Sequence, residues 1–468
     1  MKTLKLWRSV ICIMLVLMLA LTATACKGGS GDDTSYTYSE YWIEEEIEDD
    51  SADADADTGS SKDSATTTTS STGKDSGTTS TPKKDSLKKT NLKMLLWYEM
   101  PERESSVVDA FTKKTGARVQ VIKTSTANYQ TKLASLVSSG SAPDLACIFA
   151  QNYPTLVIRN LFDPIKDSEF DFDYKLWDKS LMDQYKWNGN YYGVIAKGSM
   201  YGDMWCVYYN KTLFQERGQK TPYEIWKADP NAWTWDKLRE TAKNMTYGTG
   251  SSKTYGLSCM YPQAFMLSTG KDFVNISNGK ITNTANDNDV KTAWKYINDM
   301  LDVDKSMDRA NSAVTDLINR KAAMLIEGQY QMQSENTLAK GMKDEWGVVP
   351  FPKYNSASKY YVPIRPPMWG VGKGSKNSAA AAEFLKYYLD VANEEANIYA
   401  NKECREVHAW MWEQAKGVNF NEGVLNFGGN TTSLVANIMG GSENVDSVID
   451  SNMQAINADI AAVMGEIG

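Results

Sequence analysis

Short apolar runs and helix-spaced apolar positions alternate along the chain after Leu92. Between the runs, apolar residues recur every three or four positions, as a helix with one buried face requires. The predicted order is a strand over 93–97, a helix over 104–115, a strand over 117–122, a helix over 128–138 and a strand over 145–149. This alternation favours a parallel sheet covered by helices. Ligands of such sheets bind beyond the carboxyl ends of the strands, so residues 98–100 and 151–153 should face a crevice.

A second stretch, dense in aromatic and polar residues, runs from Tyr191 to Lys237. It contains an apolar run over 192–196, a loop rich in glycine and aromatic residues, and a predicted strand over 205–209. Thr234 is predicted to be the N-cap of a further helix. A chain of 468 residues exceeds one ordinary core, which predicts two large lobes. We therefore expect this stretch to carry the chain from one lobe to the other past a solute site.

Residues 1–25 have the composition of a secretory signal. A basic start precedes an apolar run from Val10 to Leu21, which is too short for a permanent membrane span. The small residues directly before Cys26 resemble a bacterial lipobox, although Ala23 stands where leucine is commonest. This resemblance implies cleavage before Cys26 and attachment of a lipid to its sulfur. Ordinary signal cleavage nearby, with a soluble product, is the alternative.

The segment over 26–91 changes abruptly to Gly, Ser, Thr, Asp and Lys. It cannot bury enough apolar surface to order itself, so we expect the lipidated Cys26 to be followed by a disordered acidic tether. A flexible chain of this length reaches on the order of 45 Å. The formal net charge of -8 is concentrated here, which leaves the remainder nearly neutral. Because no basic cluster offsets this charge, we expect no nucleic-acid partner.

One histidine, His408, and six cysteines narrow the possible chemistry. A single imidazole removes most catalytic and zinc chemistry, and we expect His408 to be a surface or packing residue. The cysteines form no C-x-x-C pair and no metal-ligand spacing, so we expect no metal and no cofactor. Cys147, Cys206 and Cys259 have the apolar surroundings of buried thiols, whereas Cys404 lies in a more polar stretch. The pattern leaves open a disulfide among these four.

Several longer segments carry a family pattern, in one order along the chain. They are FTKKTGARVQV, YQTKLASLVSSGSAPDL, YYGVIAKGSMYGDMWCVYYNKTLF, KAAMLIEGQYQM, EWGVVPFPK and GVGKGSKNSAAAAEFLKYYL. Together they resemble the bacterial extracellular solute-binding proteins, the substrate-capturing lipoproteins of ABC importers, in the group related to maltose-binding protein. The resemblance covers essentially all of the chain from Leu92 to Gly468.

The resemblance implies a type II periplasmic-binding-protein-like α/β fold. Each of two lobes would be a mostly parallel sheet flanked by helices, with hinge strands between them. Lobe 1 would contain residues 92–195 and 364–403, and lobe 2 residues 196–363 and 404–468. The protein would be a monomeric, lipid-anchored receptor on the extracytoplasmic face of a bacterial cell membrane. It would capture a carbohydrate, most simply an oligosaccharide, between the lobes and deliver it to an ABC permease.

A sugar site needs flat aromatic faces and converging polar groups that bond hydroxyls. Ten residues at or just beyond the ends of predicted strands or crossings meet this need: Trp97, Tyr98, Glu99, Gln151, Asn152, Asp203, Trp205, Glu327, Tyr330 and Trp369. The resemblance implies that an aromatic residue at the position of Tyr330 stacks on sugar, and Gly328 would let the backbone approach the ligand.

Each candidate also has a structural interpretation. Alternation along the first strand implies that one of Trp97 and Tyr98 packs inward. Gln151 and Asn152 could instead cap the next helix, Asp203 could hold its loop, and Trp369 could pack between lobes. Trp233 and Trp235 are interpreted as structural.

An enzyme is the competing class, because Glu99, Asp203 and Glu327 include the carboxylates that a glycosidase needs. No G-x-S-x-G or metal motif supports other hydrolysis. A surface adhesin with an open, shallow face is a third possibility. Within the receptor class, a peptide, polyol or phosphodiester solute is the alternative to sugar.

Overall fold

The computed structural model describes residues 87–198, 203–309, 314–394, 398–414, 422–425, 430–441 and 444–465. The predicted signal segment, Cys26 and nearly all of the predicted tether lie outside these ranges. Among the helices of the described ranges, none is long and apolar enough to cross a membrane.

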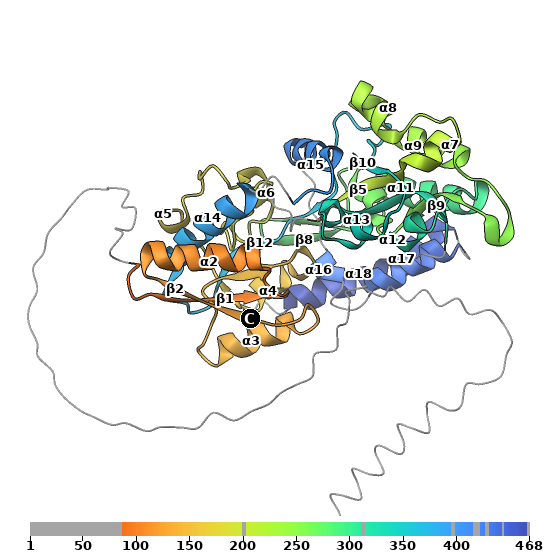
Figure 1. The fold of residues 1–468 in the computed structure, drawn as a ribbon. Coiled ribbons are helices and arrows are strands. Elements are labelled where there is room, and N and C mark those ends of the chain that lie inside the picture. Colours follow the sequence, from red (N-terminus) through yellow and green to blue (C-terminus); the bar gives the residue numbers. More distant parts are fainter. Residues whose placement is uncertain are drawn as a thin grey trace, which may run out of the picture. The chain divides into compact units, whose positions relative to one another are not determined.

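The first sheet follows the predicted strand–helix alternation closely (Figure 1). Its amino-terminal elements are β1 (Asn91–Leu96), α2 (Glu102–Thr115), β2 (Arg118–Lys123), α3 (Tyr129–Ser138) and β3 (Ala146–Ile148). β1 pairs in parallel with β2, and Met94 bridges to Leu145 in the same direction. Gly116 ends α2 with φ of 79°, the left-handed conformation that glycine adopts without strain.

A later part of the chain returns to this first sheet. It supplies β12 (Met368–Gly372), which pairs with β3 and with β4 (Phe162–Asp163), and the helix α14 (Ser378–Glu394). In Figure 1, α14 lies beside α2, and the rings of Phe111 and Phe384 meet at 5.0 Å between centroids. Residues separated by more than 250 positions therefore share one core.

The second sheet has the strand order β10-β5-β9-β6, with β11 paired to β5. Its members are β5 (Asp203–Asn210), β6 (Tyr255–Cys259), β9 (Ala322–Gly328), β10 (Trp346–Pro350) and β11 (Ile364–Arg365). Every residue of β9 is buried, as the apolar run over 322–326 predicts, and the buried residues include the carboxyl of Glu327.

Strand directions are more mixed than the sequence predicts. In the second sheet only β6 and β9 run parallel, since β5 is antiparallel to β9, β10 and β11. In the first sheet β12 is antiparallel to β3 and β4. Hydrophobic periodicity reveals that a strand exists, but the direction of β5 and β12 depends on where a long connection re-enters the sheet.

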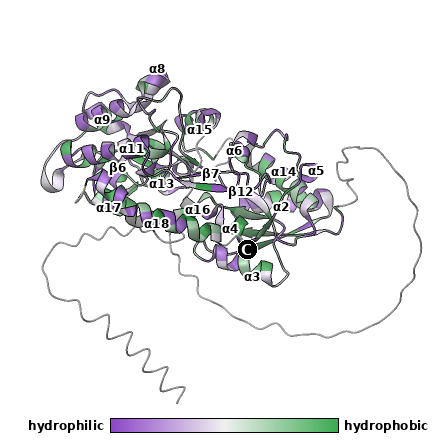
Figure 2. Cartoon of the chain, turned by 180° about the vertical axis from the view of Figure 1, so that it is seen from behind, coloured by the Kyte–Doolittle hydropathy of each residue, from purple (hydrophilic) through white to green (hydrophobic). Residues whose placement is uncertain are grey.

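Helices cover both sheets, and the longer ones have an apolar face. In Figure 2, α9 (Trp235–Asn244) and α11 (Asn288–Asn298) carry both hydrophilic and hydrophobic residues. The buried side of α11 consists of Val290, Ala293, Trp294 and Ile297, which recur every three or four residues. Thr234 caps α9 as predicted, because its hydroxyl accepts the N–H of Lys237.

The remaining elements are short or lie towards the carboxyl terminus. The helices are α4 (Thr155–Ile158), α5 (Asp167–Phe170), α6 (Lys179–Gln184), α7 (Lys211–Glu216), α8 (Pro222–Ala228), α10 (Gln263–Leu267), the π-helix η5 (Asp299–Val303), α12 (Val314–Ile318), α13 (Thr337–Gly341), α15 (Lys402–Gln414), α16 (Glu422–Leu425), α17 (Asn430–Gly440) and α18 (Val445–Gly465). Single 3-10 turns are η2 (Ala150–Asn152), η3 (Pro230–Ala232), η4 (Gly250–Ser252) and η6 (Gln329–Met332), and β7 (Val274–Ser277) pairs with β8 (Lys280–Asn283) as a hairpin.

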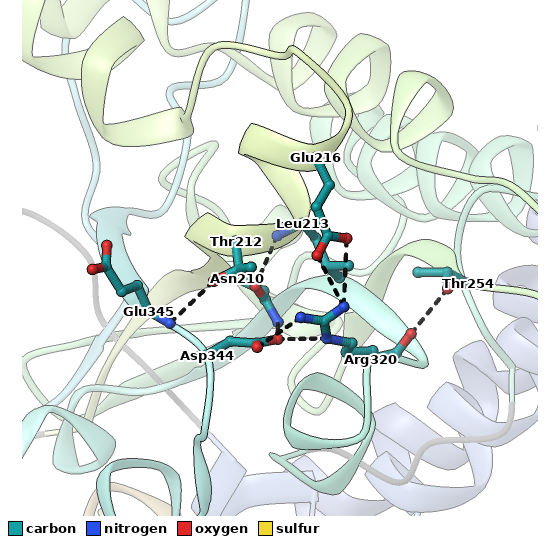
Figure 3. Close-up of polar contacts among 8 residues, drawn as sticks. All are labelled: Asn210, Thr212, Leu213, Glu216, Thr254, Arg320, Asp344 and Glu345. Carbon is teal, nitrogen blue, oxygen red and sulfur yellow. Dashed lines mark hydrogen bonds and ion pairs between the residues drawn. The ribbon is translucent and has the colours of Figure 1, made fainter.

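A polar network fastens the start of α7 to the loops before β9 and β10 (Figure 3). Asn210 is completely buried; its Oδ1 accepts the Leu213 N–H at 3.0 Å, and its Nδ2 donates to Oδ2 of Asp344 at 2.7 Å. Arg320 donates to both oxygens of Asp344, at 2.7 Å each, and to Glu216 at 3.1 Å. The hydrogen bond from Arg320, followed by that from Asn210, lowers the pKa of the Asp344 carboxyl below its ordinary value.

Candidate functional site

One group of candidate residues forms at the carboxyl ends of β1 and β3. Trp97 follows β1 and is half-buried. Its ring meets Phe149 edge-on at 4.5 Å and lies 6.0 Å from Trp369. Trp369 is 2% exposed and pairs with Cys147 of β3. The pairing of β12 with β3 thus brings Trp369 beside Trp97, as a shared site would require.

Tyr98 is turned towards the helices of this sheet. Its hydroxyl donates to Oε2 of Glu104 at 2.7 Å, and the Tyr388 hydroxyl donates to the same oxygen at 2.5 Å. Glu104 is completely buried in α2, and burial raises the pKa of its carboxyl, although the two hydroxyls act in the opposite direction. Burial also raises the pKa of Tyr98. Tyr98 therefore anchors the end of β1, while Trp97 carries the ring that meets Trp369.

The polar candidates of this group differ in their surroundings. Glu99 has a side chain that is 72% exposed and forms an ion pair with Lys123. Asn152 is buried and accepts a hydrogen bond from Nε2 of Gln130 at 2.6 Å. Gln151 is half-buried in η2. The alternative that these two amides cap the next helix is wrong, because α4 follows Pro154 and has no side-chain cap.

A second group forms where β5 and β9 pair. The register places Trp205 opposite Gly328 and Cys206 opposite Glu327. Glu327 is 2% exposed, and its Oε1 accepts the Gly328 N–H and the Tyr330 hydroxyl, both at 2.8 Å. Tyr330 itself is half-buried in η6. Three of the predicted residues are therefore neighbours although 125 positions separate the first from the last.

Gly328 has a different role from the predicted one. A Cβ atom at this position would lie 2.4 Å from Cε1 of Tyr330, which is closer than carbon atoms approach. The space above Gly328 is thus filled by the Tyr330 ring, where the sequence predicted an approaching ligand. Glycine is needed here for close contact with a side chain of the same chain.

Trp205 is covered by two residues that were not predicted from the sequence. Trp205 has no exposed surface and stacks on Tyr261 at 5.1 Å with an angle of 16° between the rings. The guanidinium carbon of Arg365 lies 5.3 Å from the Trp205 ring centroid and 5.5 Å from that of Tyr261. Tyr261 and Arg365 are half-buried, so they offer surface to a solute where Trp205 does not.

Both missed residues had a signal in the sequence. Tyr261 comes two residues after the end of β6, at the carboxyl end of a strand that runs parallel to β9. Arg365 is the second residue of the predicted return to lobe 1, which begins at 364. Asp203, which was predicted, is the backbone partner of Arg365 in the pairing of β11 with β5.

Two surface cavities lie elsewhere. One of about 320 Å³ is lined by residues between Phe172 and Ser180 together with Lys197, and one of about 370 Å³ by Lys211, Tyr223 and 401–403. None of the ten predicted residues lines either cavity. Trp233 and Trp235 are buried and donate to Pro350 and Ser268, in agreement with a structural role.

The four cysteines of the described ranges and the histidine are packing groups. Cys147, Cys206, Cys259 and Cys404 are buried free thiols, and burial raises the pKa of each, in Cys404 to about 12. The more polar sequence around Cys404 did not reveal this burial. Within the described ranges, no group of three or more His, Cys, Asp or Glu residues is placed to hold a metal ion.

His408 is buried in α15 between two aromatic partners. Nε2 accepts the indole N–H of Trp412 at 3.1 Å, and Nδ1 lies 2.8 Å from the Tyr399 hydroxyl. An indole N–H only donates, so the neutral imidazole carries its proton on Nδ1. Residues 398–400 bond through their backbone to Ser334 and Met332, each at 2.8 Å, and thereby join α15 to η6.

Two helix-covered sheets, each with aromatic and polar side chains gathered at its strand ends, define a two-lobe α/β binding protein. Residues 106–401, more than half of the chain, match the sequence pattern of the bacterial extracellular solute-binding proteins, and the chain belongs to this family. The resemblance seen in the sequence is therefore confirmed. No curated protein matches the chain.

Solved structures of similar fold are numerous. An extracellular solute-binding protein from Staphylococcus aureus, in complex with maltose, superposes with a TM-score of 0.63 at 15% identity, over 80% of this chain and 99% of that one. An ABC substrate-binding protein from Listeria monocytogenes, in complex with cycloalternan, gives 0.58 at 18% identity, over 80% and 99%. A cyclo/maltodextrin-binding protein complexed with maltotetraose gives 0.59 at 18% identity, over 80% and 96%. At these identities the likeness establishes the two-lobe fold.

Proposed function

We propose that this solute-binding protein captures an oligosaccharide between its two lobes and delivers it to an ABC permease. The observation that carries the proposal is the pair of aromatic groups at the strand ends of the two sheets. One contains Trp97 and Trp369, and the other contains Tyr261 and Tyr330. Flat rings suit the apolar faces of sugars, and the half-buried position of three of these rings leaves surface for a solute.

Polar groups next to these rings are suited to hydroxyls. Gln151 offers an amide two residues after Phe149, whose ring contacts Trp97, and Arg365 offers donors beside the second group. The solved relatives with maltose, maltotetraose and cycloalternan bind uncharged saccharides, which supports the same ligand class for this chain.

Closure of the lobes would accompany binding. β11 pairs with the second sheet and β12 with the first, and only Pro366 and Pro367 stand between them. Val194 bridges to Trp369 at the other crossing. These contacts support a first crossing close to 195 and a second at 366–367, which is two residues beyond the boundary in lobes of 92–195 with 364–403 and of 196–363 with 404–468. A solute that contacts both lobes only in the closed form shifts the population towards closure.

The anchor is part of the same proposal. Cys26 would carry the lipid and residues 26–91 the tether, so that the receptor works outside the cytoplasm beside its permease. Radiolabelled palmitate should enter the wild-type chain in cells and be absent from Cys26→Ala. Equal labelling of both would contradict the anchor.

Calorimetry tests the solute class. The purified chain is titrated with maltose, maltotriose, maltotetraose, a tripeptide, a polyol and glycerophosphodiesters, and the solutions are chromatographed afterwards. We expect saturable binding of at least one oligosaccharide, which is recovered intact. Cleaved saccharide would favour the glycosidase, and binding of only a non-sugar would replace the carbohydrate.

A further inference from the structure

Arg365 occupies an unusual place in the fold. It is the last residue of β11, the short strand that pairs with β5 of the second sheet. Trp369 of the first aromatic group follows four residues later. An extended chain advances at most about 3.5 Å per residue, so the Cα atoms of Arg365 and Trp369 lie within about 14 Å of each other. A solute of two or three hexose units is long enough to reach from Arg365 to the half-buried ring of Trp97, which lies 6.0 Å from the Trp369 ring.

The side chain of Arg365 is held by aromatic rings. Its guanidinium carbon lies within 5.5 Å of the ring centroids of both Trp205 and Tyr261, which stack on each other. Trp205 is completely buried, and its ring holds the Tyr261 ring and the Arg365 guanidinium in position. A guanidinium contacts rings through its face, while its N–H bonds lie in its own plane and suit a pair of adjacent oxygen acceptors. Ring contact and oxygen recognition are therefore compatible in one side chain.

We propose that Arg365 determines specificity by binding two adjacent hydroxyl oxygens of a neutral sugar unit, with Tyr261 as the accessible ring beside it. This inference rests on the proposed function and names the polar contact of the second lobe. Because Arg365 belongs to the crossing strand, the sugar would bind directly to the segment that joins the lobes.

The surroundings favour hydroxyls over a carboxylate on the solute. Glu327, a buried carboxyl, accepts the hydroxyl of Tyr330, the other half-buried ring of the second aromatic group, at 2.8 Å. An anionic solute that stacked on Tyr330 would approach this carboxyl, whereas hydroxyls carry no charge and both donate and accept. Neutral saccharides are therefore the ligand class that this arrangement suits.

Binding of maltotriose, or of whichever neutral oligosaccharide binds the wild-type chain, is compared by calorimetry for Arg365→Lys and Arg365→Met. Lysine keeps the charge but loses the planar fork, and methionine keeps much of the apolar stem. We expect both variants to bind the sugar about tenfold or more weakly, since hydrogen bonds to a charged group are lost.

The matched control is Arg217→Lys, because Arg217 also lies over a ring, that of Tyr247 at 4.7 Å. This control should bind within about twofold of the wild type. Thermal unfolding without sugar shows that each variant is folded at the assay temperature.

A deoxy series sharpens the test. Oligosaccharide analogues that each lack one hydroxyl should bind the wild type more weakly than the parent sugar. For the two adjacent hydroxyls that Arg365 binds, removal of either one should not weaken binding to Arg365→Met. Unchanged affinity of both Arg365 variants would overturn the inference while leaving the receptor function intact. Absence of any saccharide binding by the wild type would instead overturn the proposed function. Tighter binding of an oligogalacturonate, weakening with salt, would replace the hydroxyl pair by a carboxylate.

Discussion

Replacement of Asn210 by alanine should destabilise the second lobe more than loss of an ordinary helix cap. The side chain is completely buried and uses both ends, as the N-cap of α7 and as a donor to Asp344 (Figure 3). Loss of a cap costs about 1 kcal/mol, and loss of a hydrogen bond to a charged group costs about 1.5–3 kcal/mol. Because Arg320 still pairs with Asp344, we expect a total of about 2–4 kcal/mol.

The matched control is Thr221→Ala. Thr221 caps α8 by accepting the Glu224 N–H at 3.2 Å, and the cap lies at the surface. Its removal should cost about 1 kcal/mol. Urea unfolding, followed by tryptophan fluorescence, gives both changes in the free energy of unfolding from the shift in midpoint.

A double-mutant cycle with Asp344→Ala isolates the contact between the two side chains. We expect a coupling free energy of about 1 kcal/mol or more, because each replacement removes the same hydrogen bond. The reasoning would be refuted if Asn210→Ala lowered the free energy of unfolding by no more than Thr221→Ala does. Strict additivity in the cycle would refute it independently.

Three further outcomes follow from the structure. Because the pKa of Asp344 is lowered in the folded chain, its stabilising contribution is present above the unfolded pKa of about 3.8 and is lost as pH falls through the lower folded pKa. The free energy of unfolding should therefore fall less steeply with decreasing pH in Asp344→Asn than in the wild type. Equal slopes in the two proteins would contradict this. Tyr330→Ala should weaken oligosaccharide binding by about 1–3 kcal/mol. Tyr330→Phe, which keeps the ring but loses the hydrogen bond to Glu327, should retain most of the binding free energy, as calorimetry would reveal. The four buried thiols should not react with a disulfide reagent in the native chain and should all react after unfolding, and rapid native labelling of any of them would contradict the burial.

Local signals in the sequence predicted much of the fold. The first five elements appear within two residues of the predicted bounds, and Thr234 begins a helix as expected. These features depend on residues close together in the chain, which is why periodicity and capping rules reveal them.

Long-range pairing set the limits of prediction. The sequence suggested that one of Trp97 and Tyr98 packs inward, but the partner that holds Tyr98, Glu104, became known only from the packing of α2. Arg365 belongs to a strand of two residues, too short for any periodic signal. The role of Gly328 depends on the ring of Tyr330 folding back over it, which no spacing rule contains.

The single histidine gives the molecule an intrinsic magnetic-resonance reporter. Because His408 is the chain's only imidazole, isotope labelling of histidine yields one pair of ring nitrogen signals without assignment work. Protonation at Nδ1 and acceptance at Nε2 separate these two signals, and the backbone bonds from 398–400 to η6 connect them to the segment that carries Tyr330. Titration with sugar, followed at these two nitrogens, would therefore report on the second lobe without a label on any contact residue.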